Sequence, residues 1–191
     1  MYLPFISSIA ILPHTENSIV TYDNIILSNV TSINIDDGKK YRWEDYWNSE
    51  LSIGSNAFYG MPKLQSLTAK SQKAHIYIGD SSFCGLKDLT NVIFNAHEST
   101  LKIGNFAFQN CSNLTNINEL LSVDTVTIGD YAFSGCDRLH HLNVEKLYNI
   151  GNFAFMDCKN LLDATVNSDT TVGSGAFAYC SKLASLQFAD S

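Results

Sequence analysis

Two kinds of hydrophobic pattern alternate along this chain at a nearly fixed period. Stretches in which every second residue is apolar, such as 126–128 and 142–144, predict short half-buried β-strands. Between them, in residues 132–139, apolar positions recur at spacings of one and three, which favours a single helical or 3₁₀ turn. Each unit is therefore predicted to hold a strand, a turn, a short helical segment and a second strand.

The motif Ile/Val-Gly-x-x-Ala/Ser-Phe marks these units. Its glycines are Gly54, Gly79, Gly104, Gly129, Gly151 and Gly173, with spacings of 25, 25, 25, 22 and 22 residues. A period in the low twenties predicts a solenoid of stacked coils, because one such unit cannot bury its own apolar face. The motif phenylalanines should then form one column through the core: Phe58, Phe83, Phe108, Phe133, Phe155 and Phe177.

The corner after the first strand has its own chemistry. We expect Gly129 and its equivalents to adopt positive φ, which glycine enters without steric cost. Asp or Asn often follows the glycine, as Asp80, Asn105 and Asp130 do, and such side chains commonly bond their own backbone in turns. Phe106, Tyr131 and Phe153 come next and predict a second aromatic column, which we interpret as packing between coils.

The phrase Ile-Gly-x-x-Ala-Phe-x-x-Cys-x-x-Leu-x-x-Leu resembles the leucine-rich repeat of the BspA-like family, a class also named after a treponemal protein. The resemblance covers residues 51–188. Together with the periodicity it predicts an α/β solenoid: a right-handed array of about six coils plus a degenerate N-terminal coil. One parallel sheet should cover one face, with short helical or 3₁₀ turns on the other. The resemblance also implies surface adhesion or host contact, for example with extracellular-matrix proteins.

The N-terminal part breaks the rhythm. Residues 19–35 form a worn copy in which Ile19 aligns with Ile128, and we expect it to cap the array. An insertion at 36–50 follows and holds Trp43 and Trp47. It either folds back over the coils or forms a flap that contacts a partner, since Trp, Tyr and Arg dominate interface hot spots. The predicted organisation is a cap at 1–50 and repeats at 51–191, in one continuous domain.

The other end of the array is bare. Phe188 completes the last predicted strand, and no polar cap follows it. An exposed strand edge invites pairing with another chain. The sequence therefore predicts either truncation from a longer array or an edge-to-edge homodimer.

Composition narrows the classes of partner. The chain has 191 residues, of which 45% are hydrophobic, and this length and hydrophobic content suit one well-buried domain. Its net charge is −7. The acidic balance argues against nucleic acid or an anionic membrane as the main partner. The chain has no apolar run long enough to span a membrane. Residues 1–12 are apolar but lack Lys and Arg, so they make a poor secretory signal, and a cytoplasmic location stays open beside the cell surface.

The cysteines follow the repeat. Cys111, Cys136, Cys158 and Cys180 lie three residues after the motif phenylalanine, where earlier copies have Met61 and Leu86. A position that exchanges Cys with Met and Leu is an apolar core position, so buried, unpaired thiols are predicted. Equivalent residues on adjacent coils lie about 5 Å apart, which leaves a disulfide geometrically open.

Catalytic and metal-binding motifs are not apparent. The sequence has no Gly-rich phosphate loop, Cys-x-x-Cys pair or nucleophile elbow, and no cofactor is indicated. One acidic or amide group per coil is too few oxygens for calcium. His140 and His141 would point to opposite faces of a strand. Glu119 replaces an apolar strand residue and is interpreted as a bulge that turns Leu120 or Leu121 inward.

The outward positions of the second strands give a candidate binding surface. They carry mostly short amides and hydroxyls: Ser32, Asn34, Ser66, Thr68, Asn91, Ile93, Asn116, Asn118, His141, Asn143, Asp163, Thr165, Ser185 and Gln187. These rows are either an ordinary solvated face or a recognition surface. The leading hypothesis is a non-catalytic protein-binding module of an adhesin-like surface protein. An intracellular scaffold and, more weakly, a glycan-binding protein are the alternatives.

Overall fold

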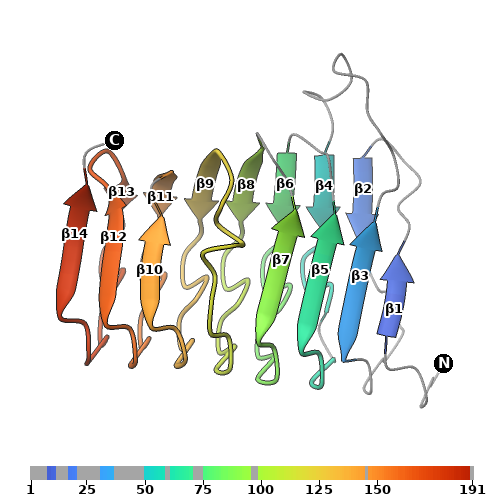
Figure 1. Cartoon of the computed structure of the whole chain (residues 1–191), viewed down its shortest axis with the longest axis horizontal. Coiled ribbons are helices and arrows are strands. Elements are labelled where there is room, and N and C mark those ends of the chain that lie inside the picture. The colour runs from blue at the N-terminus through green and yellow to red at the C-terminus, as the bar shows by residue number, and fades with distance from the viewer. Residues whose placement is uncertain are drawn as a thin grey trace.

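The chain forms a parallel-sheet β-solenoid in which two layers of strands face each other (Figure 1). The computed structural model describes residues 8–11, 17–20, 31–36, 50–58, 61–70, 75–95, 99–144 and 146–189. Trp43 and Trp47 lie outside the described residues, as does most of the 36–50 insertion.

The back layer is one continuous sheet built from the first strand of each unit. Its strands are β2 (Asn17–Val20), β4 (Glu50–Ile53), β6 (His75–Ile78), β8 (Thr100–Ile103), β9 (Thr125–Ile128), β11 (Leu147–Ile150) and β13 (Thr171–Val172). Neighbours in the order β13-β11-β9-β8-β6-β4-β2 are hydrogen-bonded.

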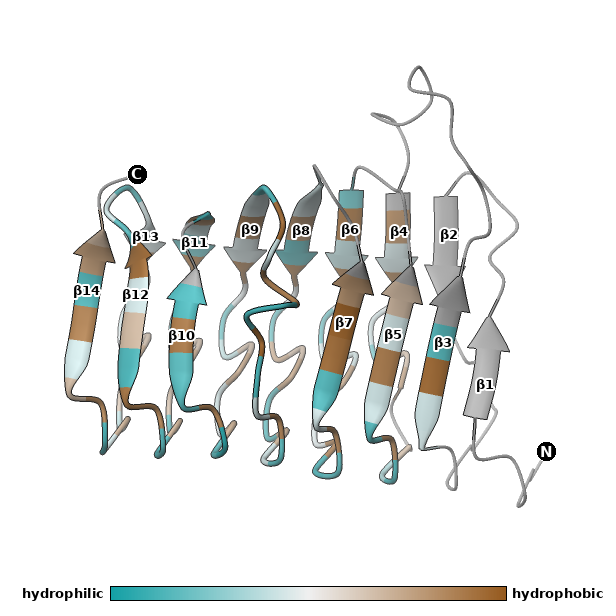
Figure 2. Ribbon diagram, viewed as in Figure 1, coloured by the Kyte–Doolittle hydropathy of each residue, from teal (hydrophilic) through white to brown (hydrophobic). Residues whose placement is uncertain are grey.

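The front layer is built from the second strands and is divided into two sheets. One holds β1 (Ser8–Ile11), β3 (Ser32–Asp36), β5 (Ser66–Lys70) and β7 (Asn91–Asn95). The other holds β10 (His141–Val144), β12 (Asp163–Asn167) and β14 (Ser185–Ala189). Figure 2 shows hydrophilic and hydrophobic residues alternating along β10 and β12, as half-buried strands require.

We expected one parallel sheet on one face and helical turns on the other, and the prediction of helical turns is wrong. The opposite face carries the seven-stranded back sheet, and the segments between the strands are turns rather than helices in the described chain. The backbone explains this. The N–H groups of Phe106, Phe108 and Asn110 bond the next coil, while those of Gln109 and Cys111 bond locally. Because alternate N–H groups leave for the neighbouring coil, no continuous helical bonding can form.

The repeat glycines do not have the conformation that we expected. Positive φ occurs two residues later, for example 55° at Tyr131, and none of the glycines at 79, 104, 129, 151 and 173 shows it. A Cβ on Gly129 would lie 2.7 Å from the carbonyl carbon of Gly104 and 2.8 Å from the amide nitrogen of Asn105. Glycine is therefore required by the close approach of adjacent coils.

The Asp and Asn residues after these glycines also bond across coils instead of within their own turn. Asp80 Oδ1 accepts the N–H of Asn105 at 2.7 Å, and Asn105 Oδ1 accepts the N–H of Asp130 at 2.8 Å. Asp130 and Asn152 continue the same ladder. These side chains hold one coil to the next.

The core column is confirmed. Adjacent motif phenylalanines stack with ring centroids between 4.7 and 5.4 Å apart. Phe58 through Phe155 in this column are fully buried, whereas Phe177 in the last coil is partly exposed. The second column is also present, because Tyr131 stacks on Phe106 at 5.2 Å and on Phe153 at 5.0 Å.

The degenerate copy is part of the solenoid, with a different register from the expected one. β2 pairs with β4 so that Val20, and not Ile19, lies opposite Ile53. Ile33 lies opposite Leu67, as its place in the repeat predicts. The copy therefore has one residue fewer between its two strands than the repeat that follows, and this shifts the alignment of the first strand.

Strand β1 was not expected. It pairs with β3, with Ile9 opposite Ile33 and Ile11 opposite Ile35. The alternation of Ile9 and Ile11 in the apolar N-terminal stretch was the signal for it.

Candidate functional site

The candidate surface is the outward side of the front layer. Ser66 in β5 lies opposite Ser32 and Asn91 in the neighbouring strands. Thr68, two residues on, lies opposite Asn34 and Ile93. The two predicted rows therefore exist in this sheet, with their members in register.

The same two rows occur in the second front sheet. His141 lies opposite Asp163, and Asn143 lies opposite Thr165. Ser185 and Gln187 of β14 extend the rows. His141 Nδ1 is 2.7 Å from Asp163 Oδ2, a contact between two exposed side chains.

Asn116 and Asn118 do not join the rows. The third coil has no second strand, and residues 116–122 form a loop with turns that separates β7 from β10. Asn116 Oδ1 accepts the N–H of Asn118, whose own Oδ1 accepts the N–H of Asn143 on β10 at 3.3 Å. Asn118 therefore bonds the edge of β10 at a point where a neighbouring strand would otherwise pair, and Asn116 bonds Asn118.

The irregularity at Glu119 is larger than the expected bulge. Glu119 is exposed, while Ile117, Leu120 and Leu121 are all buried. Burying both leucines requires the chain to leave the extended conformation, because neighbouring residues of a strand point to opposite faces. The loop crosses the middle of the front layer in Figure 1.

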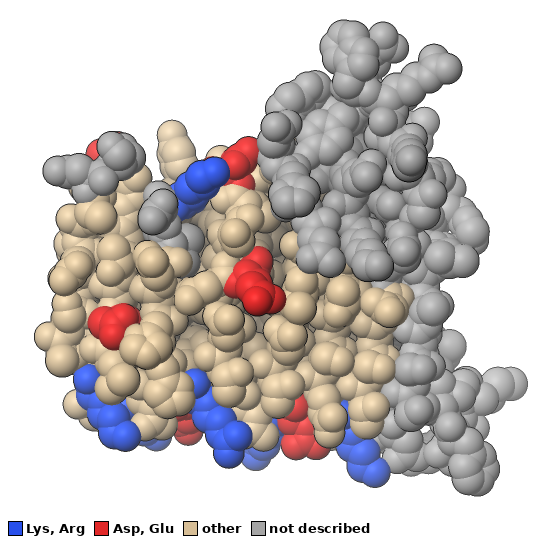
Figure 3. All heavy atoms as spheres, viewed as in Figure 1, with Lys and Arg blue, Asp and Glu red and all other residues tan. Residues whose placement is uncertain are grey.

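Charge is sparse on the front face. Figure 3 shows it as mostly uncharged, with Lys and Arg gathered along the lower rim, beneath the start of the front strands. Exposed cations of the connecting turns include Lys87, Arg138 and Lys159. Apart from Glu119 in the 116–122 loop and Asp163 in the rows, the face is thus uncharged and polar, with a charged border.

The β14 edge is open on one side in the described chain, since β14 pairs with β12 alone. Leu186 and Phe188 on this strand are 40% and 52% exposed. The edge-to-edge homodimer stays a prediction, and this is the surface on which it would form.

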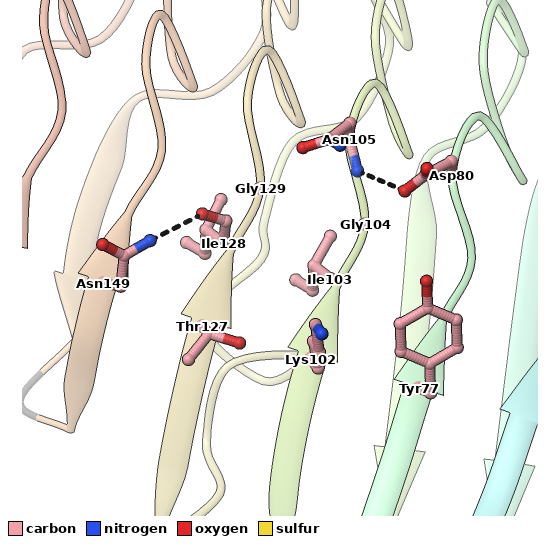
Figure 4. A pocket seen from close by; sticks show the side chains of 10 residues that line it. All are labelled: Tyr77, Asp80, Lys102, Ile103, Gly104, Asn105, Thr127, Ile128, Gly129 and Asn149. Atoms are coloured by element: carbon pink, nitrogen blue, oxygen red, sulfur yellow. Dashed lines mark hydrogen bonds between the residues drawn. The ribbon is translucent and has the colours of Figure 1, made fainter.

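Sequence reasoning missed a second row of side chains, on the back layer. Tyr77, Lys102, Thr127 and Asn149 lie in register on β6, β8, β9 and β11. They line a shallow groove of about 510 Å³ (Figure 4). The available signal was the polar or aromatic residue directly before the Ile-Gly of each of these strands, because alternation places the neighbour of a buried strand residue outward.

Among the described residues, the cysteine thiols are the groups whose pKa values are shifted. Cys111, Cys136 and Cys158 are buried free thiols, as predicted. Cys180, for which burial was also predicted, is half-buried in the last coil, and so is Cys84. Each repeat cysteine donates its S–H to the carbonyl of a phenylalanine in the preceding coil; Cys136, for example, bonds Phe108 at 3.3 Å. Burial raises the pKa of Cys111 to about 12 and that of Cys136 well above its usual value. The pKa of Cys180 is lowered, because the Cys158 S–H can turn from the Phe133 carbonyl to a Cys180 thiolate and stabilise it.

These shifts predict an order of alkylation. Thiolate is the reactive form, so at pH 8 iodoacetamide should modify Cys180 first and Cys136 and Cys158 last in the native protein. After denaturation without reductant, all five cysteines should react. Mass spectrometry of timed samples measures both. A disulfide would lower the final number, and labelling of Cys136 as fast as Cys180 would contradict the described burial.

Two further features of the described chain concern metals and membranes. Its His, Cys, Asp and Glu side chains form no group of three or more that could hold a metal ion. It also contains no helix with the length and apolar character needed to cross a bilayer.

Two facing layers of parallel strands and a repeated Phe-Cys-Leu core define a leucine-rich-repeat solenoid. A family model described as "BspA type Leucine rich repeat region" matches six copies within residues 51–184. The chain therefore belongs to the BspA-type leucine-rich-repeat family. A comparison with curated proteins found no match.

Two solved structures share the fold. A leucine-rich cell surface protein from Faecalibacterium prausnitzii A2-165 is 24% identical with a TM-score of 0.56, over 71% of this chain and 42% of that one. A leucine-rich-repeat protein from Treponema pallidum is 18% identical with a TM-score of 0.52, over 98% of this chain and 77% of that one. The chain thus spans less than half the length of the Faecalibacterium protein.

Proposed function

We propose that this protein is a non-catalytic binding module whose front face holds a protein partner at a cell surface. The observation that carries the proposal is the pair of in-register rows on the front sheets. They are exemplified by Ser66 with Asn91 and by Asn143 with Thr165. Short amides and hydroxyls on a rigid scaffold offer many hydrogen bonds at little cost in side-chain ordering.

The shape of the front face supports a protein partner of some size. Rows on both sheets flank the 116–122 loop, so a partner that spans both sheets also meets the one irregular segment between them. Solenoids bind along such extended faces. The surface location is part of the proposal and extends the description of the Faecalibacterium protein to this chain.

The proposal is tested by affinity capture from the organism's surface fraction, with quantitative mass spectrometry. In the variant Asn143→Arg/Thr165→Arg, two bulky cations stand in the middle of the second front sheet. We expect the amount of specifically captured protein to fall at least about tenfold, because an unpaired charge at the centre of an interface lowers the affinity. Thr171→Arg places the same side chain on an exposed back-layer strand and should bind as the unmodified protein does. Equal capture by both variants would refute the front-face assignment.

A further inference from the structure

The back layer carries a groove that the front-face proposal does not use. One wall is the row of outward strand residues Tyr77, Lys102, Thr127 and Asn149. The other wall is the start of the Asp/Asn ladder, Asp80 and Asn105 (Figure 4). The groove runs across the strands, along the axis of the solenoid.

The floor of the groove follows from the repeat itself. Gly104 and Gly129 lie between the two walls and lack side chains. A Cβ on Gly104 would fall within 2.8 Å of the amide nitrogen of Asp80 in the preceding coil. The space beside these two glycines is taken by Oδ1 of Asp80 and Oδ1 of Asn105, so the missing side chains let the Asp/Asn ladder lie directly against the floor of the groove.

The polar groups in the groove are held in place and only partly used. Asp80 and Asn105 each commit Oδ1 to the N–H of the next coil, which fixes both side chains. Among the described residues, none bonds the second carboxylate oxygen of Asp80 or the amide nitrogen of Asn105. Asn149 donates its amide to the Ile128 carbonyl at 3.4 Å, which leaves its Oδ1 as an acceptor. The site therefore offers preset donors and acceptors.

Tyr77 supplies an aromatic surface at one end. Figure 4 shows its ring lying along the strand, with the hydroxyl directed toward Asp80. Lys102 Nζ lies over the ring, 5.7 Å from its centroid, so this exposed and flexible side chain must turn aside for a sugar to stack on that face. An aromatic ring beside fixed amides, carboxylate and hydroxyl pairs an apolar platform with hydrogen-bonding groups. This combination matches a sugar ring, which has an apolar C–H face and a polar rim of hydroxyls.

The net charge of the lining and the direction of the groove relative to the strands favour a glycan over other occupants. One ammonium, on Lys102, and one carboxylate, on Asp80, give the lining no net charge, which fits a neutral occupant. A peptide lying here would find no sheet edge for main-chain pairing, because the groove crosses the strands. Adjacent coils repeat at about 4.8 Å, close to the advance of an extended polysaccharide per sugar.

From these features we infer that the back groove, lined by Tyr77, Asp80, Lys102, Asn105, Thr127 and Asn149, is a binding site for a neutral, linear glycan. The C–H face of one sugar stacks on Tyr77. The hydroxyls of the following sugars bond the amides and Thr127. The site lies on the opposite layer from the protein-binding face, so the two proposals stand or fall separately.

The test uses the full chain and isothermal titration with cello-, manno- and chito-oligosaccharides. Polygalacturonate oligomers and extended peptides serve as charged and peptidic probes. We expect one neutral series to bind, with the affinity reduced about tenfold or more by Tyr77→Ala and within about threefold of the original in Tyr77→Phe, which keeps the ring. Thr127→Trp replaces one wall residue with a side chain large enough to fill the groove and should abolish binding. Tyr148→Ala removes an exposed tyrosine from β11 outside the groove and should change nothing.

Several results would overturn the assignment. One is the absence of binding by every neutral series at millimolar concentration. Another is binding by the acidic or peptidic probes alone. A third is neutral-glycan binding that Thr127→Trp leaves intact. Thermal unfolding of each variant shows whether it is folded. If Tyr77→Ala is not folded, the result for Thr127→Trp decides whether the groove binds the glycan.

Discussion

Replacing Phe133 with alanine should lower the free energy of unfolding by about 3–5 kcal/mol, the range for truncating a large buried aromatic side chain. Phe133 is fully buried and stacks on both neighbours, with centroids 5.1 Å from Phe108 and 5.3 Å from Phe155. A cavity at this point weakens the contact of its coil with the coils on either side. Because a solenoid is stabilised by its nearest-neighbour interfaces, the effect should exceed that of a change at the end of the array.

The matched control is Phe177→Ala. Phe177 belongs to the same column, but it is partly exposed and stacks on Phe155 alone in the described chain. We expect a loss of about 1–2 kcal/mol there, since fewer contacts are removed and water already reaches the site. Urea unfolding followed by far-ultraviolet circular dichroism measures both losses. Equal losses would show that the column does not act as a set of coupled interfaces.

How far the sequence predicts this fold depends on whether a feature is local or arises between coils. The Phe column and the buried cysteines follow from periodicity, because residues at equivalent places stack when coils stack. The roles of Gly129 and Asp80 were misassigned because their partners are 25 residues away in sequence. A single coil resembles an isolated turn, in which glycine supplies positive φ and aspartate bonds its own backbone. Stacking replaces both roles with inter-coil contacts.

The prediction of a helical turn between the strands failed for the same reason, because contacts between coils decide the conformation of this segment. Spacings of one and three between Ala132, Phe133 and Cys136 suit a helical turn and equally suit a tight β-solenoid corner. The choice is made by Tyr131 and its equivalents, whose positive φ directs the neighbouring N–H groups toward the next coil. A non-glycine residue with positive φ cannot be recognised from the sequence of one repeat.

The candidate surfaces were predictable to different degrees. The front rows follow from strand alternation, and Ser66, Thr68 and Asn91 lie where expected. Asn116 and Asn118 were misplaced because Ile117 and two adjacent leucines are all buried, which alternation alone does not allow. The back row was missed because the first strands were considered only for their apolar positions.

Gly129→Ala should be as damaging as the loss of a core side chain, although it adds a single methyl group. Its Cβ would lie 2.7 Å from the Gly104 carbonyl carbon and 2.8 Å from both the amide nitrogen and Oδ1 of Asn105. Two of these three atoms are backbone, so the clash is relieved only by moving one coil away from the other. That movement also strains the bond from the Asp130 N–H to Asn105 Oδ1. We expect a loss of about 3 kcal/mol or more, at the upper end for overpacking.

Gly85→Ala separates crowding from backbone conformation. Gly85 has φ of +75°, and a Cβ there would meet nothing within 4 Å. The cost is then that of a left-handed alanine alone, about 1–2 kcal/mol. Gly129 presents the opposite case, since its φ is ordinary and its space is filled. Urea unfolding should therefore rank Gly129→Ala well below Gly85→Ala in stability. The reverse order would mean that the repeat glycine serves backbone conformation after all, and that adjacent coils can separate at little cost.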